Sequence, residues 1–201
     1  MLKRIDPKEI GQNVFSLIGD QWMLITAGSR ERCNTMTASW GGLGVIWGAP
    51  AATCYIRPQR YTKEFVDREE YFTLCFFGEE YRKALSLCGS KSGRDVDKFA
   101  ACGLHAAPGS VLTDCPILEE SPVNLECKVT QVIPLGSHDL FLAEVVACDV
   151  DESLLDEKGK LCLDKANLIV YSHGEYLALG KKLGTFGYSV RKKKPAKRKK
   201  Q

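Results

Sequence analysis

With 201 residues and 22.3 kDa, the chain is long enough for one sizeable hydrophobic core, and nothing in it demands a second domain. Its hydrophobic fraction of 44% and its charged fraction of 26% are ordinary for a soluble globular protein. The N-terminal residues lack an apolar core long enough for a signal peptide, and no apolar run approaches a membrane span. We therefore exclude a membrane protein and expect a cytoplasmic one.

The net charge of +3 is unevenly distributed, because eight of the 28 basic residues lie within residues 191–201. The remaining 20 basic residues face 25 acidic ones, so residues 1–190 carry a net charge of −5. We expect one domain over residues 1–190, followed by a disordered basic tail. The tail could attract phosphate groups of nucleic acid or lipid, but it has no interleaved aromatic residues for base stacking. A function on nucleic acid is not expected.

Short apolar runs and turn residues predict a chain with more strands than helices. In chain order, we expect a helix start within Asp6–Gly19, strands over Trp22–Ala27, Ala51–Ile56, Tyr71–Phe77, Leu125–Ile133, Phe141–Val150 and Leu168–Tyr171, and helices over Lys63–Asp67, over Glu79–Cys88 before Gly89, and from Asp95. The hairpin-like succession of strands favours a mainly β fold, a small antiparallel barrel with helical excursions.

Residues 41–50 contain four glycines and a proline, so we expect a mobile loop there. Trp47 lies within this segment. Its indole could cover a ligand or contact another subunit, and the sequence leaves both interpretations open.

The stretch before this loop alternates in chemical character. If it is extended, Thr35, Thr37 and Ser39 share one face. Met36, Ala38 and Trp40 then share the other face. Such a strand could bind a flat aromatic ring through backbone amides, hydroxyl groups and the polarisable methionine sulfur.

Two arginines follow, beside an expected helix start. Arg57 and Arg60 carry forked donors that suit phosphate oxygens. Thr62 is expected to cap the helix, whose free amides would add a further anion site. The whole stretch from Asn34 to Thr62 therefore suits a flat aromatic ligand that carries a phosphate.

Five segments carry a resemblance to a known family. They read N-T-M-T-A-S-W from Asn34, R-P-Q-R-Y-T from Arg57, G-R-D-V-D-K-F from Gly93, L-E-C-K-V from Leu125 and H-D-L-F-L-A-E-V from His138. In this order they resemble the flavin reductase-like family, the FMN-binding split barrels that include flavoredoxin. The resemblance covers all but the basic tail and implies a Greek-key-like antiparallel split β-barrel with FMN as its cofactor.

The resemblance assigns roles to residues that have ordinary alternatives. Trp40 would lie beside the flavin ring rather than fill the core, and Lys98 would contact flavin or phosphate oxygens rather than water. His138 would approach the flavin, whereas His105 and His173 are expected to be ordinary surface or turn residues. The full set of expected cofactor-binding residues is Asn34, Thr35, Met36, Thr37, Ala38, Ser39, Trp40, Arg57, Gln59, Arg60, Thr62, Lys98, His138 and Tyr171.

The family implies an oxidoreductase that passes electrons from NADH or NADPH through FMN to an acceptor, and a homodimer with the flavin near the subunit boundary. No side chain need act as nucleophile, acid or base, so no catalytic residue is named. The chain has no G-x-G-x-x-G fingerprint after a strand, so a nicotinamide would have to stack on an open flavin face. Two alternatives are a flavoredoxin-like carrier reduced by a protein partner, and a non-enzymatic flavin-binding module.

Nine cysteines are scattered without any C-x-x-C pair. Their neighbours are mostly apolar, as in T-L-C-F-F and L-E-C-K-V. We expect reduced and largely buried thiols rather than disulfides, and no metal site.

Overall fold

The computed structural model describes residues 2–5, 23–172 and 175–178. The predicted helix start within Asp6–Gly19, the first residue of the predicted strand Trp22–Ala27, His173 and the basic tail of residues 191–201 lie outside the described residues.

Strands dominate the described chain. They are β1 (Leu2–Ile5), β2 (Met23–Gly28), β3 (Cys33–Ala38), β4 (Gly41–Ile46), β5 (Ala49–Ile56), β6 (Tyr71–Phe76), β7 (Ala106–Pro108), β8 (Pro116–Leu118), β9 (Val123–Pro134), β10 (Asp139–Asp151), β11 (Ile169–Ser172) and β12 (Glu175–Ala178). The α-helices are α2 (Tyr61–Glu69), α3 (Arg82–Ser90) and α4 (Lys98–Cys102), and short 3-10 turns are η2 (Glu79–Tyr81), η3 (Glu152–Leu154) and η4 (Leu163–Lys165). The expected mainly β fold is confirmed.

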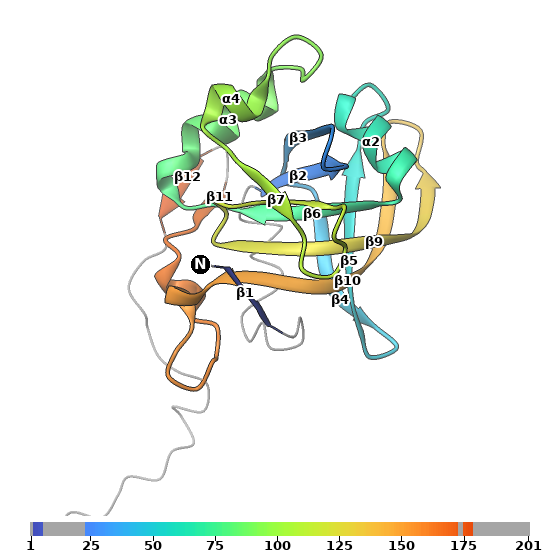
Figure 1. The fold of residues 1–201 in the computed structure, drawn as a ribbon. Helices are drawn as coiled ribbons and strands as arrows, with labels where there is room; N and C mark the ends of the chain where they lie inside the picture. Colours follow the sequence, from blue (N-terminus) through green and yellow to red (C-terminus); the bar gives the residue numbers. More distant parts are fainter. Residues whose placement is uncertain (1, 6–22, 173–174, 179–201) are drawn as a thin grey trace, which may run out of the picture.

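One eight-stranded antiparallel sheet organises the molecule (Figure 1). Its order is β3-β2-β6-β9-β10-β5-β4, and β1 pairs with β10. The chain leaves β5 near one end of this order and enters the middle at β6, after passing through α2. This crossing makes the sheet Greek-key-like rather than a simple meander.

The sheet separates two hydrophobic clusters. The larger one lies inside the curved sheet and includes Met23, Ile25, Phe72 and Phe141. Leu24, on the opposite face of β2, belongs to a smaller cluster with residues of α3. Because both faces of β2 are covered, all six of its residues are buried.

Helix α2 begins earlier than the sequence indicated. Arg60, not Thr62, occupies the N-cap position, with extended backbone angles and no side-chain cap. Thr62 lies within the first turn and is fully buried, and its Oγ1 accepts a hydrogen bond from Asn34 Nδ2 at 2.9 Å. The prediction that Thr62 caps the helix was wrong, because a partner from β3 takes its hydroxyl group.

The segment predicted as a mobile loop is a regular hairpin. Strands β4 and β5 pair from Gly41↔Cys54 to Ile46↔Ala49. Trp47 and Gly48 form its two-residue turn, with φ of 50° and 80°. Positive φ at both positions is the geometry of tight hairpin turns. The prediction failed because glycine content was read as mobility, whereas pairing with β5 orders the backbone.

Two helix ends also differ from expectation. Helix α3 continues through Gly89 to Ser90 instead of stopping before the glycine. The side chain of Asp97, not Asp95, caps α4 by accepting hydrogen bonds from the N–H groups of Phe99 and Ala100, at 3.0 and 3.1 Å. The predicted strands in the second half of the chain are confirmed, with β9 and β10 longer than expected.

Candidate functional site

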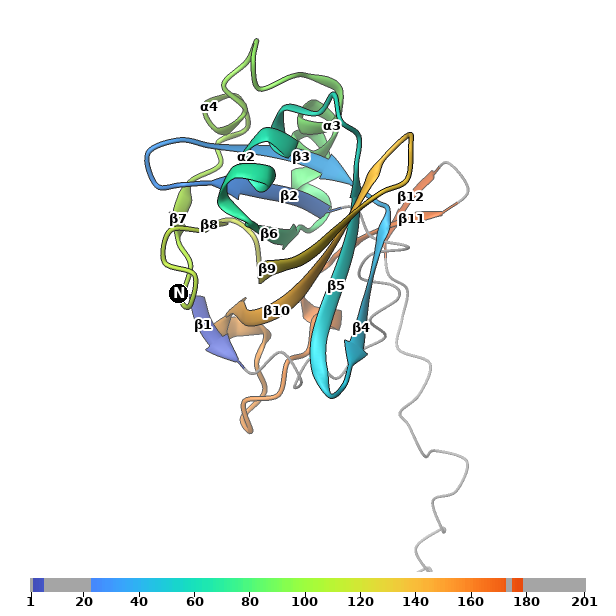
Figure 2. The ribbon, with the colours of Figure 1, turned by 90° about the vertical axis from the view of Figure 1, so that its right-hand side faces the viewer.

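A cavity of about 430 Å³ opens between β3, the end of β5 and the C-terminal part of α3. Helix α3 lies over β3, and the hairpin formed by β9 and β10 reaches toward the same side of the molecule (Figure 2). The lining residues are Met36, Thr37, Ala38, Ser39, Trp40, Tyr55, Arg57, Arg60, Ser86, Gly89, Ser90 and His138.

The predicted alternation of β3 is confirmed. Met36 and Ala38 contact the large core cluster. Thr35 bonds Thr26, with 3.0 Å between the two Oγ1 atoms, and Thr37 Oγ1 donates to the carbonyl of Leu85 on α3 at 2.5 Å. Both threonine hydroxyls therefore hold the strand against its neighbours. Thr37 also lines the cavity, together with Met36, Ala38 and the residues that follow the strand.

Strand β3 ends the described sheet, so one of its edges has no partner strand there. The Thr35 carbonyl accepts a hydrogen bond from Lys98 Nζ at 2.7 Å, and the Thr37 carbonyl accepts one from Arg60 Nη2 at 3.3 Å. In an antiparallel strand, the N–H and C=O of one residue point to the same side. The N–H of Thr37, a lining residue, thus faces this outer edge and offers a donor to a ligand.

The two predicted arginines differ in their environment. Arg60 is half-buried and also donates from Nη1 to the carbonyl of Gly89 at 3.0 Å, so it joins β3 to α3. Burial first, and then the neighbouring charge of Arg57, lower the pKa of the Arg60 guanidinium. Arg57 is exposed and makes no hydrogen bond or ion pair to any described side chain. Its donors are therefore available to an anion in the cavity.

An aromatic pair stands at the mouth of the cavity. The rings of Trp40 and His138 lie 5.3 Å apart between centroids and are inclined by 56°. Ser137 Oγ lies 3.0 Å from His138 Nδ1, which orients the imidazole ring. Trp40 is 63% exposed, so it is not core filler. A large exposed aromatic beside a cavity is suited to stacking on a flat ring.

Five of the predicted binding residues do not line this cavity. They are Asn34, Thr35, Gln59, Thr62 and Lys98. Asn34, Thr35 and Thr62 are buried, and Asn34 donates a hydrogen bond to Thr62. Gln59 is exposed, and only its carbonyl is engaged, by Arg94 at 3.4 Å. The side chain of Tyr171 lies outside the described residues.

Lys98 occupies an unusual position for a lysine. It is only 3% exposed, and its ammonium group donates to the carbonyls of Thr35 and Cys88, at 2.7 and 2.9 Å. Burial lowers the pKa of Lys98. The alternative of a solvated helix lysine is therefore wrong. Lys98 instead joins α4 to the edge of β3 and to α3.

Four lining residues were absent from the sequence prediction. Tyr55 is the next-to-last residue of β5, while Ser86, Gly89 and Ser90 lie on one side of α3. Gly89 and Ser90 follow Ser86 by three and four positions, which places all three residues along one helix face. That spacing was visible in the sequence, but it did not reveal which strand the face would meet.

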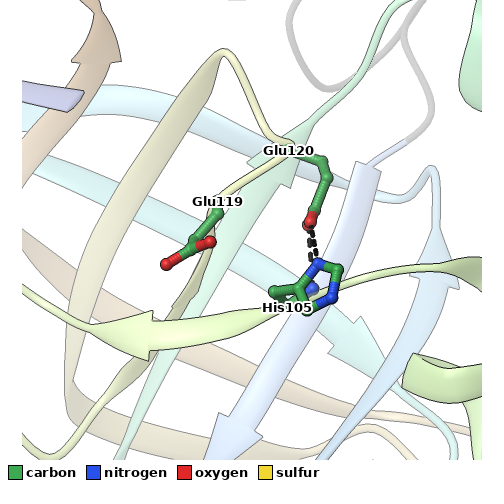
Figure 3. A group of neighbouring side chains, drawn as sticks. All are labelled: His105, Glu119 and Glu120. Atoms are coloured by element: carbon green, nitrogen blue, oxygen red, sulfur yellow. Dashed lines mark hydrogen bonds and ion pairs between the residues drawn. The ribbon is translucent and has the colours of Figure 1, made fainter. Parts of the chain in front are cut away.

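A separate group of titratable residues brings together His105, Glu119 and Glu120 (Figure 3). Both oxygens of Glu120 are engaged by His105, through its backbone N–H at 2.9 Å and its Nδ1 at 2.5 Å. The hydrogen bond and charge of Glu120 raise the pKa of His105. His105 and Glu120 form a hydrogen-bonded surface pair that joins the start of β7 to the end of β8, in agreement with the expectation of an ordinary surface histidine.

Comparison with known proteins places this arrangement in a family. Residues 15–180 match the Flavin reductase like domain, a span that contains the whole cavity. The chain belongs to the flavin reductase-like family. Within the described part of the chain, none of the helices has the length and apolar character that crossing a membrane requires.

Solved members of the family share the fold. Flavoredoxin of Desulfovibrio vulgaris (Miyazaki F) is similar with a TM-score of 0.76 and 27% identity, over 86% of this chain and 93% of that one. The FMN-binding protein from Thermus thermophilus with bound 1-cyclohex-2-enone gives a TM-score of 0.69 and 30% identity, over 83% and 89%. The expected split β-barrel is thereby confirmed.

A sequence relative, FMN reductase (NADH) RutF of Enterobacter cloacae subsp. cloacae, is 32% identical over 62 residues. The match covers 31% of this chain and 35% of the relative.

Proposed function

We propose that the chain binds FMN in the cavity between β3 and α3 and acts as a flavin reductase-type oxidoreductase. The observation that supports this proposal is the set of hydrogen-bond donors around the cavity. They are the guanidinium of Arg57, which has no partner among the described residues, and the backbone N–H of Thr37 at the outer edge of β3. The volume of about 430 Å³ falls in the range of ordinary cofactor sites. A ring and a phosphate thus find both apolar and cationic partners in the lining of one cavity.

Each lining group then has a task in holding the cofactor. Met36 and Ala38 supply apolar contact for the ring, and Trp40 and His138 flank it at the mouth. Arg57 binds the phosphate, while Arg60 keeps α3 against β3 so that the cavity holds its shape. When bound, FMN supplies the redox chemistry, and these residues position it and limit its contact with water.

NADH or NADPH is the proposed electron donor. The family and the RutF relative, whose name specifies an NADH-dependent FMN reductase, support this choice. The similarity to flavoredoxin supports a second function, that of an FMN electron carrier that a redox protein reduces. In both cases the open mouth beside Trp40 is the route by which electrons reach the cofactor.

The experiment begins with the absorption spectrum of the protein as purified, and of apo-protein to which FMN is added. We expect a flavin spectrum that stays with the protein through gel filtration. Anaerobic NADH or NADPH should then bleach the bound flavin within the time of mixing. Bleaching only after addition of a reduced redox protein would favour the carrier, and no retention of FMN would contradict both functions.

We propose further that the protein works as a homodimer in the cytoplasm. The hairpin of β4 and β5 extends from the body of the molecule (Figure 1). Its tip exposes Val45, Ile46 and Trp47, with Trp47 fully exposed. Such a contiguous apolar tip suits a contact with a second copy of the chain. All nine cysteines are unpaired, which is consistent with a reducing compartment.

A further inference from the structure

Two thiols face each other behind the cavity. Cys88 on α3 and Cys102 on α4 have their sulfur atoms 3.9 Å apart. Cys88 is fully buried, whereas Cys102 is half-buried and reaches solvent. Sulfur atoms this close need to move by only about 2 Å to reach the length of a disulfide bond.

We propose that Cys88 and Cys102 form a reversible disulfide when the protein meets hydrogen peroxide, and that this bond alters the cofactor cavity. In the first step, the Cys102 thiol loses its proton, its sulfur attacks one peroxide oxygen and the O–O bond breaks, so that Cys102 becomes a sulfenic acid and the other oxygen leaves as hydroxide, which the released proton converts to water. In the second step, the Cys88 sulfur attacks the Cys102 sulfur, the S–O bond breaks, and the Cys88 proton joins the leaving hydroxyl group to form a second water. Two thiols are oxidised by two electrons in all, and one peroxide is reduced to two waters.

The different burial of the two thiols indicates the order of these steps. Burial first, and then the neighbouring Cys102, raise the pKa of the Cys88 thiol to about 12, against the opposing effect of the cations of Lys98 and Arg60. Cys88 therefore stays protonated and shielded until the sulfenic acid forms beside it. Cys102, which reaches solvent, is the thiol that meets the oxidant first.

The bond would act on the cavity through α3. The residue after Cys88 is Gly89, which lines the cavity and whose carbonyl accepts the hydrogen bond of Arg60 at 3.0 Å. The carbonyl of Cys88 itself accepts the bond of Lys98, at the first residue of α4. Drawing α3 and α4 together must shift these contacts. This part of the inference rests on the proposed FMN site, and we expect the oxidised protein to bind FMN at least threefold more weakly.

The bond itself is tested on the full-length protein without cofactor. The protein is treated with hydrogen peroxide, alkylated without reduction, and digested with trypsin and Asp-N. These enzymes place Cys88 in peptide 84–91 and Cys102 in peptide 99–113, each with no second cysteine. We expect a linked pair of these two peptides that dithiothreitol separates. Recovery of both peptides only as separate alkylated or over-oxidised species would overturn the proposal.

Variants separate this bond from general oxidation damage. Cys102→Ser should remove the linked pair and keep the FMN dissociation constant unchanged by peroxide, with Cys102→Ala as a substitute if the serine variant does not fold. Cys162→Ser, at another half-buried cysteine, should behave as the parent protein does. A linked pair with no change in FMN affinity would overturn the effect on the cavity. Failure of the reduced protein to bind FMN would instead contradict the proposed function.

Discussion

At the scale of single residues, the two arginines near the cavity have different duties. Arg60 is committed to the carbonyls of Thr37 and Gly89, and Arg57 is exposed beside the cavity. We expect Arg57→Ala to weaken FMN binding about tenfold or more, because a charge-assisted bond to phosphate is lost. Fluorescence titration of apo-protein with FMN and with riboflavin measures the two dissociation constants. Only the affinity for FMN should fall.

Arg60→Ala should behave differently, since it removes a link between β3 and α3. We expect it to lower stability and to weaken FMN and riboflavin alike. Arg82→Ala, at an exposed arginine at the start of α3, is the control that should change neither. If Arg57→Ala binds FMN as tightly as the parent does, Arg57 is not the phosphate ligand.

Lys98 is expected to matter for stability even without cofactor. Lys98→Met keeps the apolar stem but leaves the carbonyls of Thr35 and Cys88 without their donor. Loss of hydrogen bonds from a charged group costs roughly 1.5–3 kcal/mol of unfolding free energy. Urea denaturation of the apo-protein measures this loss, and weaker FMN retention should accompany it. Lys91→Met, at an exposed lysine nearby, should be neutral; equal stability of the two variants would contradict the buried role.

Asp149 and Glu126 form a buried carboxyl pair between β10 and β9. Glu126 accepts backbone N–H bonds from Ser110 at 2.6 Å and Leu112 at 2.5 Å, among others, so it keeps its negative charge. Asp149 Oδ2 is buried and has no partner among the described atoms. Burial first, and then the adjacent Glu126 carboxylate, raise the pKa of Asp149 from 3.8 to about 7. Between these two pH values, the folded protein therefore keeps a proton on Asp149 that the unfolded chain has released.

This difference gives the sign of a pH effect. Because the folded state binds more protons than the unfolded state between pH 3.8 and about 7, stability falls as pH rises through that window. Asp149→Asn removes the titrating group and keeps a donor for Glu126. We expect the thermal midpoint of the variant to exceed that of the parent by a margin that grows as pH rises from 3.8 to about 7 and is fully present at pH 8. Parallel pH profiles of the two proteins would show that Asp149 is not responsible.

At the scale of elements, the hairpin of β4 and β5 shows how pairing overrides composition. Gly41–Ile46 is rich in glycine, yet it forms a full strand because β5 supplies a partner for its backbone. The same tertiary contact sends Trp47 to the exposed end of the hairpin. Unlike Trp40, Trp47 does not line the cavity, so of the two roles considered for Trp47 we propose the subunit contact.

At the scale of the whole molecule, the proposed homodimer depends on that tip. We expect the parent protein to sediment at twice the mass of the chain, and Trp47→Lys to shift it toward a single chain, because a charge replaces a large apolar contact. Val111→Lys, at an exposed apolar residue outside the hairpin, is the matched control and should stay dimeric. A parent protein that sediments as a single chain at micromolar concentration would refute the dimer.

Much of the fold could be predicted because local patterns carry it. The period-2 alternation of β3, the apolar runs of β6, β9 and β10, and the motifs from Asn34, Arg57 and Gly93 all lie within short windows of sequence. Eight of the predicted binding residues do meet in one cavity: Met36, Thr37, Ala38, Ser39, Trp40, Arg57, Arg60 and His138.

Only the tertiary structure decided which polar groups already have hydrogen-bond partners within the protein. Thr62 is engaged by Asn34, 28 positions away, and Lys98 by the Thr35 carbonyl, 63 positions away. A local window cannot reveal such partners, because they depend on how distant elements pack. The sequence alone therefore determined most of the longer strands and the family, whereas the packing of α3 and α4 on β3 decided which donors face the cavity.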